Sequence, residues 1–344
     1  MHVLVTGHDG YIGTVLVPVL LEAGHRVTGL DASFYEGCEL FPPRAGVPAL
    51  RLDVRDVTPG RLAGFDAVVH LAGLSNDPLG ALDPELTREI NFEATVGLAR
   101  AAREAGAGRF VFASSCSMYG TADADVPAAE DAPLRPLTAY AESKVRAEEA
   151  LAALADADFA PVLMRNATAY GASPRMRVDL VLNNLVGWAL TTGRVRILSD
   201  GTPWRPLVHV EDIALATLAA LEAPHQLVAG EAFNVGAGAE NYQVRELAEI
   251  VREAVPGCEI EYAGSGEPDP RSYRVDFGKL RRAFPALELT WTASRGAAEM
   301  RDALRAGGLT RETFEGPRFT RLKQLESLLA EGLLDARLRR QEAA

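Results

Sequence analysis

The sequence predicts an α/β fold in which helices cover both faces of a parallel sheet, followed by a smaller C-terminal lobe of α+β structure. Three observations indicate this fold. Short β-branched runs alternate with longer amphipathic segments over the first half of the chain, a glycine-rich turn follows the first run, and the pattern loosens into turns and short elements after residue 166. Together they are typical of a doubly wound sheet with an attached lobe.

Six apolar runs are the expected strands of the sheet. Each run is short and is bounded by Gly, Asp or Pro, as buried parallel strands are. They lie at 2–7, 26–31, 49–54, 67–73, 109–115 and 161–166. The parallel sheet is therefore expected within the first half of the chain.

Two long helices are expected near 83–105 and 137–155, because apolar residues recur there at three- and four-residue spacing. These residues are Ile90, Ala94, Leu98 and Ala101 on the first helix and Val145, Ala147, Leu151 and Leu154 on the second. Such apolar faces pack on a sheet or form a surface shared between two copies of a chain. Packing on the sheet is the simpler reading, and a homodimer through these helices is the assembly that we expect.

The composition argues against several classes of function. The 344 residues carry a formal net charge of −12, whereas a protein that binds a phosphate backbone needs a basic face, so we expect no nucleic-acid partner. The three cysteines, Cys38, Cys116 and Cys258, lack metal-ligand spacing, so neither a metal site nor a disulfide framework is expected. The chain begins with a strand-like run, and no apolar run approaches about 18 residues. We therefore expect a cytoplasmic protein without a membrane partner.

The stretch VTGHDGYIG follows the first strand and opens a helix. Gly7 permits a tight turn, Gly10 allows a close approach of the backbone, and Gly13 lets helix and strand pack closely, while the helix N-terminus favours a pyrophosphate. Asp31, which lies 18 residues after Gly13, can accept hydrogen bonds from ribose hydroxyls and would repel a 2′-phosphate. The sequence therefore predicts a Rossmann-type site for NAD rather than NADP. Asp53 ends the following strand and either contacts the dinucleotide or caps that strand.

Tyr140 and Lys144 are candidate catalytic residues. They lie four apart in AYAESK, on one face of a predicted helix, and Lys144 is one of three lysines in the chain. A phenol is a poor base at neutral pH, but a neighbouring ammonium stabilises the phenolate, so we expect Lys144 to lower the pKa of Tyr140. A hydroxyl partner is expected at the carboxyl end of a neighbouring strand, where Ser114, Ser115 and Ser117 lie.

At this point the chain resembles the extended short-chain dehydrogenase/reductases. Within that group it looks most like the NAD-dependent nucleotide-sugar epimerases of the UDP-glucose 4-epimerase type. The resemblance covers about residues 1–290 and rests on these stretches, in order: VTGHDGYIG, Asp31, HLAGL at 70–74, NFEAT at 91–95, FVFASSCSMYG, YAESK, RNATAYG at 165–171 and WRPLVHVED at 204–212.

The resemblance implies roles for individual residues. Ser115 matches the catalytic hydroxyl, Tyr140 the base and Lys144 its partner, and Asn91 matches an asparagine that helps to position this network. Contacts with NAD are expected from Gly7, Gly10, Tyr11, Ile12, Gly13, Asp31, Asp53, Val54, Leu71, Ala72, Gly73, Asn91, Tyr140 and Lys144. Contacts with a nucleotide sugar are expected from Ser75, Ser115, Ser117, Thr168, Asn183, Asn184, Arg205, Arg271 and Arg274.

The chain also departs from the pattern of its apparent family. The 4,6-dehydratases carry Asp-Glu directly after the catalytic hydroxyl, and the uronate decarboxylases use a Glu at the second of these positions. Here the two positions hold Cys116 and Ser117, which argues against both reactions. Cys116 is expected to be a packed residue rather than a nucleophile. A family arginine of the phosphate clamp aligns with Gly266, so Arg271 or Arg274 is expected to replace it.

The chain is expected to divide into three parts. Residues 1–165 with about 208–236 would form the NAD-binding domain, and about 166–207 with 237–308 the substrate lobe. Residues 309–344 would form a helical tail, with a helix near 319–332 whose leucines are expected to dock on the core rather than on a partner. These leucines are Leu322, Leu325, Leu328 and Leu329.

Three hypotheses of function follow from these residues. The first is an NAD-dependent epimerase of a nucleotide sugar, in which Tyr140 takes the proton of a hydroxyl, at C4 by expectation, while a keto-sugar forms transiently and hydride returns to its other face. The second is a keto-sugar reductase or dehydrogenase that uses NAD(P), or else a dehydratase. The third is a catalytically silent NAD-binding or scaffold protein, since folds of this kind host many functions.

Overall fold

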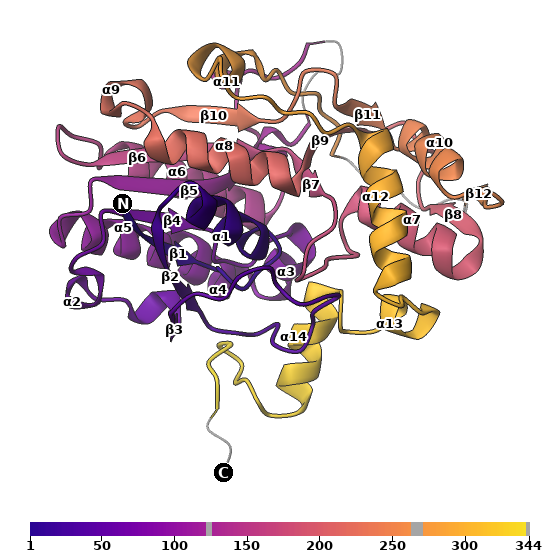
Figure 1. Ribbon diagram of the computed structural model, residues 1–344, viewed down its shortest axis with the longest axis horizontal. Coiled ribbons are helices and arrows are strands. Elements are labelled where there is room, and N and C mark those ends of the chain that lie inside the picture. The colour runs from indigo at the N-terminus through magenta and orange to yellow at the C-terminus, as the bar shows by residue number, and fades with distance from the viewer. Residues whose placement is uncertain (122–125, 263–270, 342–344) are drawn as a thin grey trace.

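The computed structural model describes residues 1–121, 126–262 and 271–341. Its centre is a sheet of seven strands in the order β10-β6-β5-β4-β1-β2-β3, and each neighbouring pair runs parallel (Figure 1). The strands are β1 (His2–Thr6), β2 (Arg26–Asp31), β3 (Ala49–Arg51), β4 (Ala67–His70), β5 (Arg109–Ser115), β6 (Ala160–Asn166) and β10 (Ala232–Val235). The predicted parallel sheet is confirmed.

Helices cover both faces of this sheet, as the doubly wound fold requires. One face packs against α1 (Gly13–Glu22), α8 (Val210–Glu222) and α11 (Gly278–Ala283). The other face packs against α2 (Pro59–Leu62), α5 (Ala94–Glu104) and α6 (Ala139–Ala152). Chain order reverses between β1 and β4, and in open parallel sheets ligands bind at the carboxyl ends of strands at such a point.

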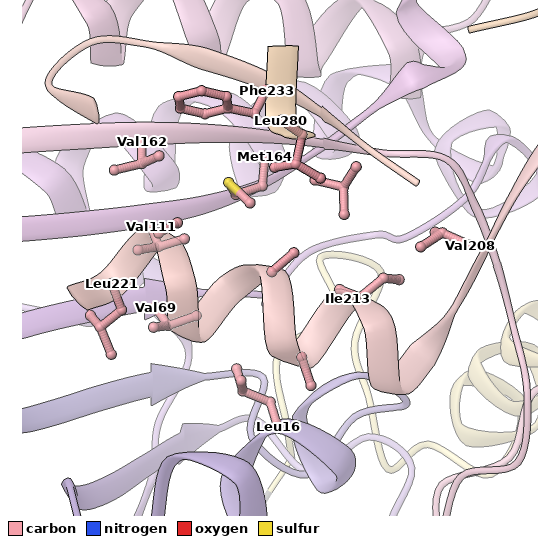
Figure 2. Packing of buried hydrophobic residues seen from close by; sticks show 14 of the residues in the cluster. Leu16, Val69, Val111, Val162, Met164, Val208, Ile213, Leu221, Phe233 and Leu280 are labelled. Carbon is pink, nitrogen blue, oxygen red and sulfur yellow. The ribbon is translucent and has the colours of Figure 1, made fainter. Parts of the chain in front are cut away.

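The strands read as continuous apolar runs because both of their faces are buried. Val69 and Val111 point to the α8 side, where they join the same apolar cluster as Leu221 of that helix (Figure 2). Their chain neighbours Val68 and Phe110 point to the opposite side. The two-residue period of a strand therefore supplies one apolar layer to each face.

The two long helices differ in detail from the sequence prediction. The first is divided into α4 (Pro84–Arg88), one π-helical turn (Glu89–Glu93) and α5, and a short helix, α3 (Asp77–Leu82), precedes it. Ala94, Leu98 and Ala101 of α5 and Ala147 and Leu151 of α6 lie in the core cluster on the sheet. For these residues the sheet-packing interpretation is confirmed.

Two predicted strands end earlier than expected. The run 49–54 is a strand only as far as Arg51, because Asp53 caps a 3₁₀ turn (Val54–Asp56) by accepting a hydrogen bond from the backbone N–H of Arg55 at 2.9 Å. The run 67–73 is a strand only as far as His70, and Gly73 then takes a φ of +151°. After Arg51 and after His70 the chain therefore continues as a loop at the carboxyl edge of the sheet.

A smaller lobe of α+β structure accompanies the main sheet, as predicted. Its strands are β7 (Thr168–Tyr170), β9 (Trp204–His209) and β11 (Asn241–Gln243) in one sheet, and β8 (Arg194–Ile197) paired in parallel with β12 (Glu259–Tyr262) in another. Its main helices are α7 (Val181–Thr192), α10 (Val244–Ala254), α12 (Ala293–Ala306) and α13 (Arg311–Glu315), and α9 (His225–Val228) lies beside the main sheet. A second apolar cluster joins these elements.

The C-terminal segment contains one further helix, α14 (Arg321–Ala330), within the predicted range 319–332. Leu325 is fully buried and packs with Leu79 and Leu86 of α3 and α4. The expectation that this helix docks on the core is therefore confirmed. Among the helices of the described residues, none combines the length and hydrophobicity needed to cross a bilayer.

Candidate active site

The glycine loop between β1 and α1 leaves no room for a Cβ at Gly7 or Gly13. Gly7 has a φ of +71°, and a Cβ on it would lie 2.8 Å from the backbone nitrogen of Ala72. A Cβ on Gly13 would lie 2.3 Å from the carbonyl oxygen of Gly7. The turn is closed by a hydrogen bond from Gly10 N–H to Gly7 O at 3.0 Å. This cradle at a helix N-terminus fits the diphosphate of a dinucleotide.

The two residues between Gly10 and Gly13 point in different directions. Tyr11 is buried, and its hydroxyl donates to the Gly171 carbonyl at 2.7 Å, so it ties the glycine loop to the smaller lobe. Burial raises the pKa of this hydroxyl. Ile12 lines the main cavity described below.

Asp31 ends β2, as predicted, whereas Asp53 lies two residues beyond the end of β3. Asp31 accepts hydrogen bonds from the N–H groups of Ser33 at 2.8 Å and Asp9 at 3.2 Å, and burial raises its pKa. Burial also acts to raise the pKa of Asp53, but hydrogen bonds and the charge of Arg55 lower it overall. The Asp53 carboxylate caps the 3₁₀ turn Val54–Asp56 rather than the strand itself, and Val54 beside it is buried.

Ser115, Tyr140 and Lys144 line one cavity, which has a volume of about 490 Å³. Ser115 ends β5, and Tyr140 and Lys144 lie in the first turns of α6, whose N-cap is Thr138. Gly80 of α3 packs against Tyr140 so closely that a Cβ on Gly80 would lie 2.9 Å from the Tyr140 Cβ. The position of the phenol is therefore fixed from two helices.

The pKa values of this trio do not follow the sequence expectation. Burial raises the pKa of Tyr140 to about 12, and a hydrogen bond with Ser115 acts in the opposite direction. Burial lowers the pKa of Lys144 to about 8. The Lys144 ammonium donates to the Ala113 carbonyl at 2.8 Å and lies 4.5 Å from the centre of the Phe112 ring. The expected lowering of the Tyr140 pKa is therefore wrong, because desolvation by burial outweighs the hydrogen bond with Ser115 and the charge of Arg177, which act to lower it.

Asn91 holds the loop that follows β4. Its side chain donates to the Leu74 carbonyl at 2.9 Å and accepts from the Leu74 N–H at 2.8 Å. A Cβ on Gly73 would lie 2.9 Å from the Asn91 Oδ1. Asn91 therefore fixes the loop Leu71–Leu74, which contributes Leu71 and Gly73 to the cavity wall.

The cavity brings together most of the expected substrate residues. It is lined by Ser75, Ser117, Thr168, Asn184, Arg205 and Arg271 as well as the trio. Two expected residues lie elsewhere. The side chain of Asn183 is buried and hydrogen-bonds to the Tyr11 hydroxyl at 3.2 Å, and Arg274 lies over the Trp204 ring at 4.9 Å and lines a second cavity. Gly266 lies outside the described residues.

Adjacent residues of a helix point about 100° apart, which explains the difference between Asn183 and Asn184. Asn184 lines the cavity and donates to the Val178 carbonyl at 2.9 Å. Asn183 faces the lobe interior, where it also accepts from the Gly171 N–H at 3.1 Å. The pair could not be separated from the sequence because both residues are polar.

The sequence reasoning missed a polar network on the cavity wall. Arg177 pairs with Asp179 at 3.0 Å and donates to the Ser75 hydroxyl at 3.2 Å, while Asn76 donates to Asp179 at 2.6 Å. The signal available was PRMRVD, which follows the RNATAYG turn after two intervening residues and in which Arg177 and Asp179 stand two residues apart. Asp77 and Arg271, nearly two hundred residues apart in the chain, form a further ion pair there.

Cys116 is a packed residue, as expected. It is fully buried, and its thiol donates to the Arg165 carbonyl at 3.1 Å. Burial raises the pKa of this thiol well above its usual value. A thiolate nucleophile needs the opposite environment, so the position after Ser115 supplies neither a nucleophile nor an acid of ordinary strength.

Comparisons with known proteins identify the family to which such a site belongs. A family model described as "NAD dependent epimerase/dehydratase family" matches residues 3–236. The chain is 33% identical to a UDP-glucose 4-epimerase of Corynebacterium glutamicum, over 85% of this chain and 91% of that protein. It is 31% identical to a dTDP-glucose 4,6-dehydratase of Streptomyces griseus, over 84% and 90% respectively.

Solved structures are similar over nearly their whole length. The UDP-glucose 4-epimerase of Thermus thermophilus in complex with NAD has a TM-score of 0.75 and 28% identity, covering 89% of this chain and 99% of that one. MoeE5 in complex with UDP-glucuronic acid and NAD has a TM-score of 0.77 and 28% identity, covering 89% and 99%. With the glycine cradle and the Ser-Tyr-Lys cavity in place, the chain belongs to the NAD dependent epimerase/dehydratase family.

Proposed function

We propose that this protein is an NAD-dependent epimerase of a nucleotide-activated sugar and that C4 is the centre it inverts. The single observation that carries the proposal is the cavity shared by Ser115, Tyr140 and Lys144 with Thr168 and Arg205. Several similar proteins are named UDP-glucose 4-epimerase, and some of the similar structures hold UDP-sugars with NAD. The cavity residues and the names and ligands of these similar proteins together support a nucleotide sugar as the substrate class.

The residues of the chain supply proton transfer and positioning. NAD, when bound, supplies the hydride acceptor. Tyr140 is placed to take the proton of the sugar hydroxyl and to return it, and Ser115, which lines the same cavity, is placed to bind the same oxygen. The buried ammonium of Lys144 holds positive charge beside the phenol, 5.8 Å from the centre of its ring.

We assign binding of the nucleotide and sugar to the polar side chains of the same cavity. Thr168, Asn184 and Arg205 line it, and Arg205 donates to the Trp204 carbonyl at 2.8 Å, which directs its guanidinium along the wall. Residues 1–165 with about 208–236 would bind NAD, about 166–207 with 237–308 the substrate, and 309–344 would form the tail. Asn183 and Arg274 would act by supporting this wall from behind.

The positions after Ser115 favour epimerisation over dehydration. Loss of water from a sugar needs an acid that protonates the departing hydroxyl. Cys116 is buried with a raised pKa, and Ser117 has a hydroxyl that accepts from Ser115 at 2.9 Å. Neither is an acid of suitable strength. A dehydratase therefore ranks below an epimerase, although one relative is named as a dehydratase.

A homodimer through α4, α5 and α6 is our proposal for the assembly. The apolar residues of α5 and α6 pack on the sheet, so the dimer would use the outer faces, which carry the ion pairs Arg88–Glu93 and Arg146–Glu142. Light scattering of the purified protein at several concentrations tests this, and a single monomeric mass would contradict it. We further propose a cytoplasmic location, where the three free cysteines would stay reduced.

Replacement of Tyr140 by Phe tests the proposed function. The variant should interconvert UDP-glucose and UDP-galactose about 10²- to 10⁴-fold more slowly than the wild type, because positioned acid–base groups contribute that much. NAD released from the denatured variant should still match the protein in amount. Unchanged turnover would refute the assignment of the base. Binding of UDP-glucose by both proteins with no turnover by either would favour a silent NAD-binding protein.

A further inference from the structure

The last described residues, 333–341, fold back on themselves as a hairpin. Leu334 and Arg340 form an antiparallel bridge, and Gln341 N–H donates to the Leu333 carbonyl at 3.0 Å. The Asp335 side chain accepts hydrogen bonds from the N–H groups of Arg337 at 2.9 Å and Arg339 at 2.8 Å. The hairpin, which we call the strap, therefore presents its arginines from a fixed turn.

Arg340 of the strap reaches the loop that follows β2. Its guanidinium donates to the Ala32 carbonyl at 2.8 Å and to the Ser33 carbonyl. These two residues directly follow Asp31, and Ser33 donates its N–H to the Asp31 carboxylate at 2.8 Å. The strap is therefore attached to the segment in which a dinucleotide-binding fold holds the adenosine ribose.

Arg339 and Arg337 attach the strap to two further points. Arg339 lies 3.4 Å from the Asp53 carboxylate, which caps the 3₁₀ turn after β3, and also pairs with Asp56. Arg337 pairs with Glu89, which lies in the π-helical turn that also contains Asn91. The strap thus joins the loops after β2 and β3 to the helix that fixes the loop after β4.

Apolar packing also holds the strap against α3 and α4. Leu334 and Leu338 are buried and pack with Leu79 and Leu86 in the cluster that also contains Leu74. In Figure 1 the yellow C-terminal segment leaves α14 and turns back toward β3. Before the strap, Arg321 of α14 is buried and donates to the Arg175 carbonyl at 2.8 Å, in the smaller lobe. The C-terminal segment therefore spans from the smaller lobe to the adenosine side of the main sheet.

From these contacts we propose that the strap closes the adenosine end of the NAD site and makes NAD a resident cofactor, with Arg339 and Arg340 as the residues that hold it closed. The contacts surround the carboxyl ends of β2 and β3, where the adenosine of a dinucleotide lies in this fold. NAD then leaves only after Arg339 and Arg340 have separated from the loops after β2 and β3 and the leucines from α3 and α4. Retention suits an enzyme without net redox change, a consequence that rests on the proposed function.

Exchange of bound NAD tests the strap independently of catalysis. The purified holoprotein is mixed with excess isotopically labelled NAD, and the NAD that remains bound after rapid gel filtration is measured by mass spectrometry. The double variant Arg339→Ala/Arg340→Ala and a chain that ends at Gly332 are compared with the wild type. The matched control is Arg311→Ala, because Arg311 is exposed and pairs with Glu315 within its own helix.

We expect both strap variants to exchange NAD faster than the wild type by an order of magnitude, roughly tenfold or more, and the control to stay within about twofold. Exchange at the wild-type rate in both variants would overturn the proposal. If the shortened chain unfolds because its leucines are lost, the double variant, which retains Leu334 and Leu338, decides alone. Faster exchange without any sugar turnover would leave the strap in place and refute the epimerase instead.

Discussion

Replacement of Lys144 by Met should lower activity and raise stability at the same time. Lys144 is 7% exposed, and burial lowers its pKa from the usual 10.5 to about 8. This difference corresponds to about 3 kcal/mol, because each pKa unit is worth about 1.4 kcal/mol. The folded wild type pays that amount to keep Lys144 charged at neutral pH.

The Lys144→Met variant avoids this cost, but it also loses a hydrogen bond. The Ala113 carbonyl, which accepts from Lys144 at 2.8 Å, would lose its donor at a cost of about 1 kcal/mol. Methionine otherwise fills a similar volume in an apolar site. The net expectation at pH 7 is therefore a variant more stable than the wild type by about 2 kcal/mol.

The control is the pH dependence of the difference in unfolding free energy between the wild type and the variant. Below pH 8 the lysine is charged in both the folded and the unfolded chain, so the full cost is present. Between about pH 8 and 10.5 the folded protein releases the proton first, so the wild type gains stability and the difference between the two proteins shrinks.

Urea unfolding of the two cofactor-free proteins from pH 7 to pH 10 measures this difference. Free protein is required because a ligand that binds only the folded chain would add its own stabilisation. A variant that is less stable than the wild type at pH 7, or a difference that stays constant up to pH 10, would refute the reasoning. Turnover of a nucleotide sugar by the same variant should fall, since the ammonium beside Tyr140 is lost.

Three further predictions address the cradle, the hydroxyl and the core. Gly13→Ala places a Cβ 2.3 Å from Gly7 O, so little NAD should remain in the purified variant, and wild-type NAD content would count against the cradle. Ser115→Ala removes a hydroxyl that acts to lower the Tyr140 pKa and is placed to bind the reacting oxygen, so kcat should fall by about 10- to 100-fold, the effect of one lost hydrogen bond to a charged group. An unchanged kcat would be inconsistent with this role. Burial lowers the pKa of His70 to about 3, so as the pH falls below 6.5 the unfolded chain takes up a proton before the folded protein does, and stability is lost. The urea midpoint of His70→Gln should therefore fall less steeply with decreasing pH than that of the wild type. Equal slopes would contradict this.

The features predicted correctly depend on short-range patterns. The glycine loop and the pair Tyr140 and Lys144 are each defined within a dozen residues, so a strand-turn-helix or one helical face is enough to place them. The strands of the main sheet were found because they are buried on both faces and therefore read as apolar runs. Their ends at Arg51 and His70 were set by a cap and a glycine, which the apolar pattern does not record.

The features that were missed depend on long-range contacts. Asn76 and Asp179 meet across more than one hundred residues, and Arg339 meets Asp53 from the far end of the chain. No local spacing indicates such pairs. The raised pKa of Tyr140 was missed for a related reason, because desolvation depends on everything packed around the phenol, including Gly80 of α3.

The most direct test of the proposed function is an isotope experiment without added cofactor. The purified protein is incubated with UDP-galactose that carries deuterium at C4, and the products are separated and analysed by mass spectrometry and NMR. An epimerase with resident NAD yields UDP-glucose in which the deuterium remains at C4, since hydride leaves and returns within one cavity. A requirement for added cofactor, loss of the label, or release of NADH in proportion to product would contradict epimerisation and favour a reductase or dehydrogenase.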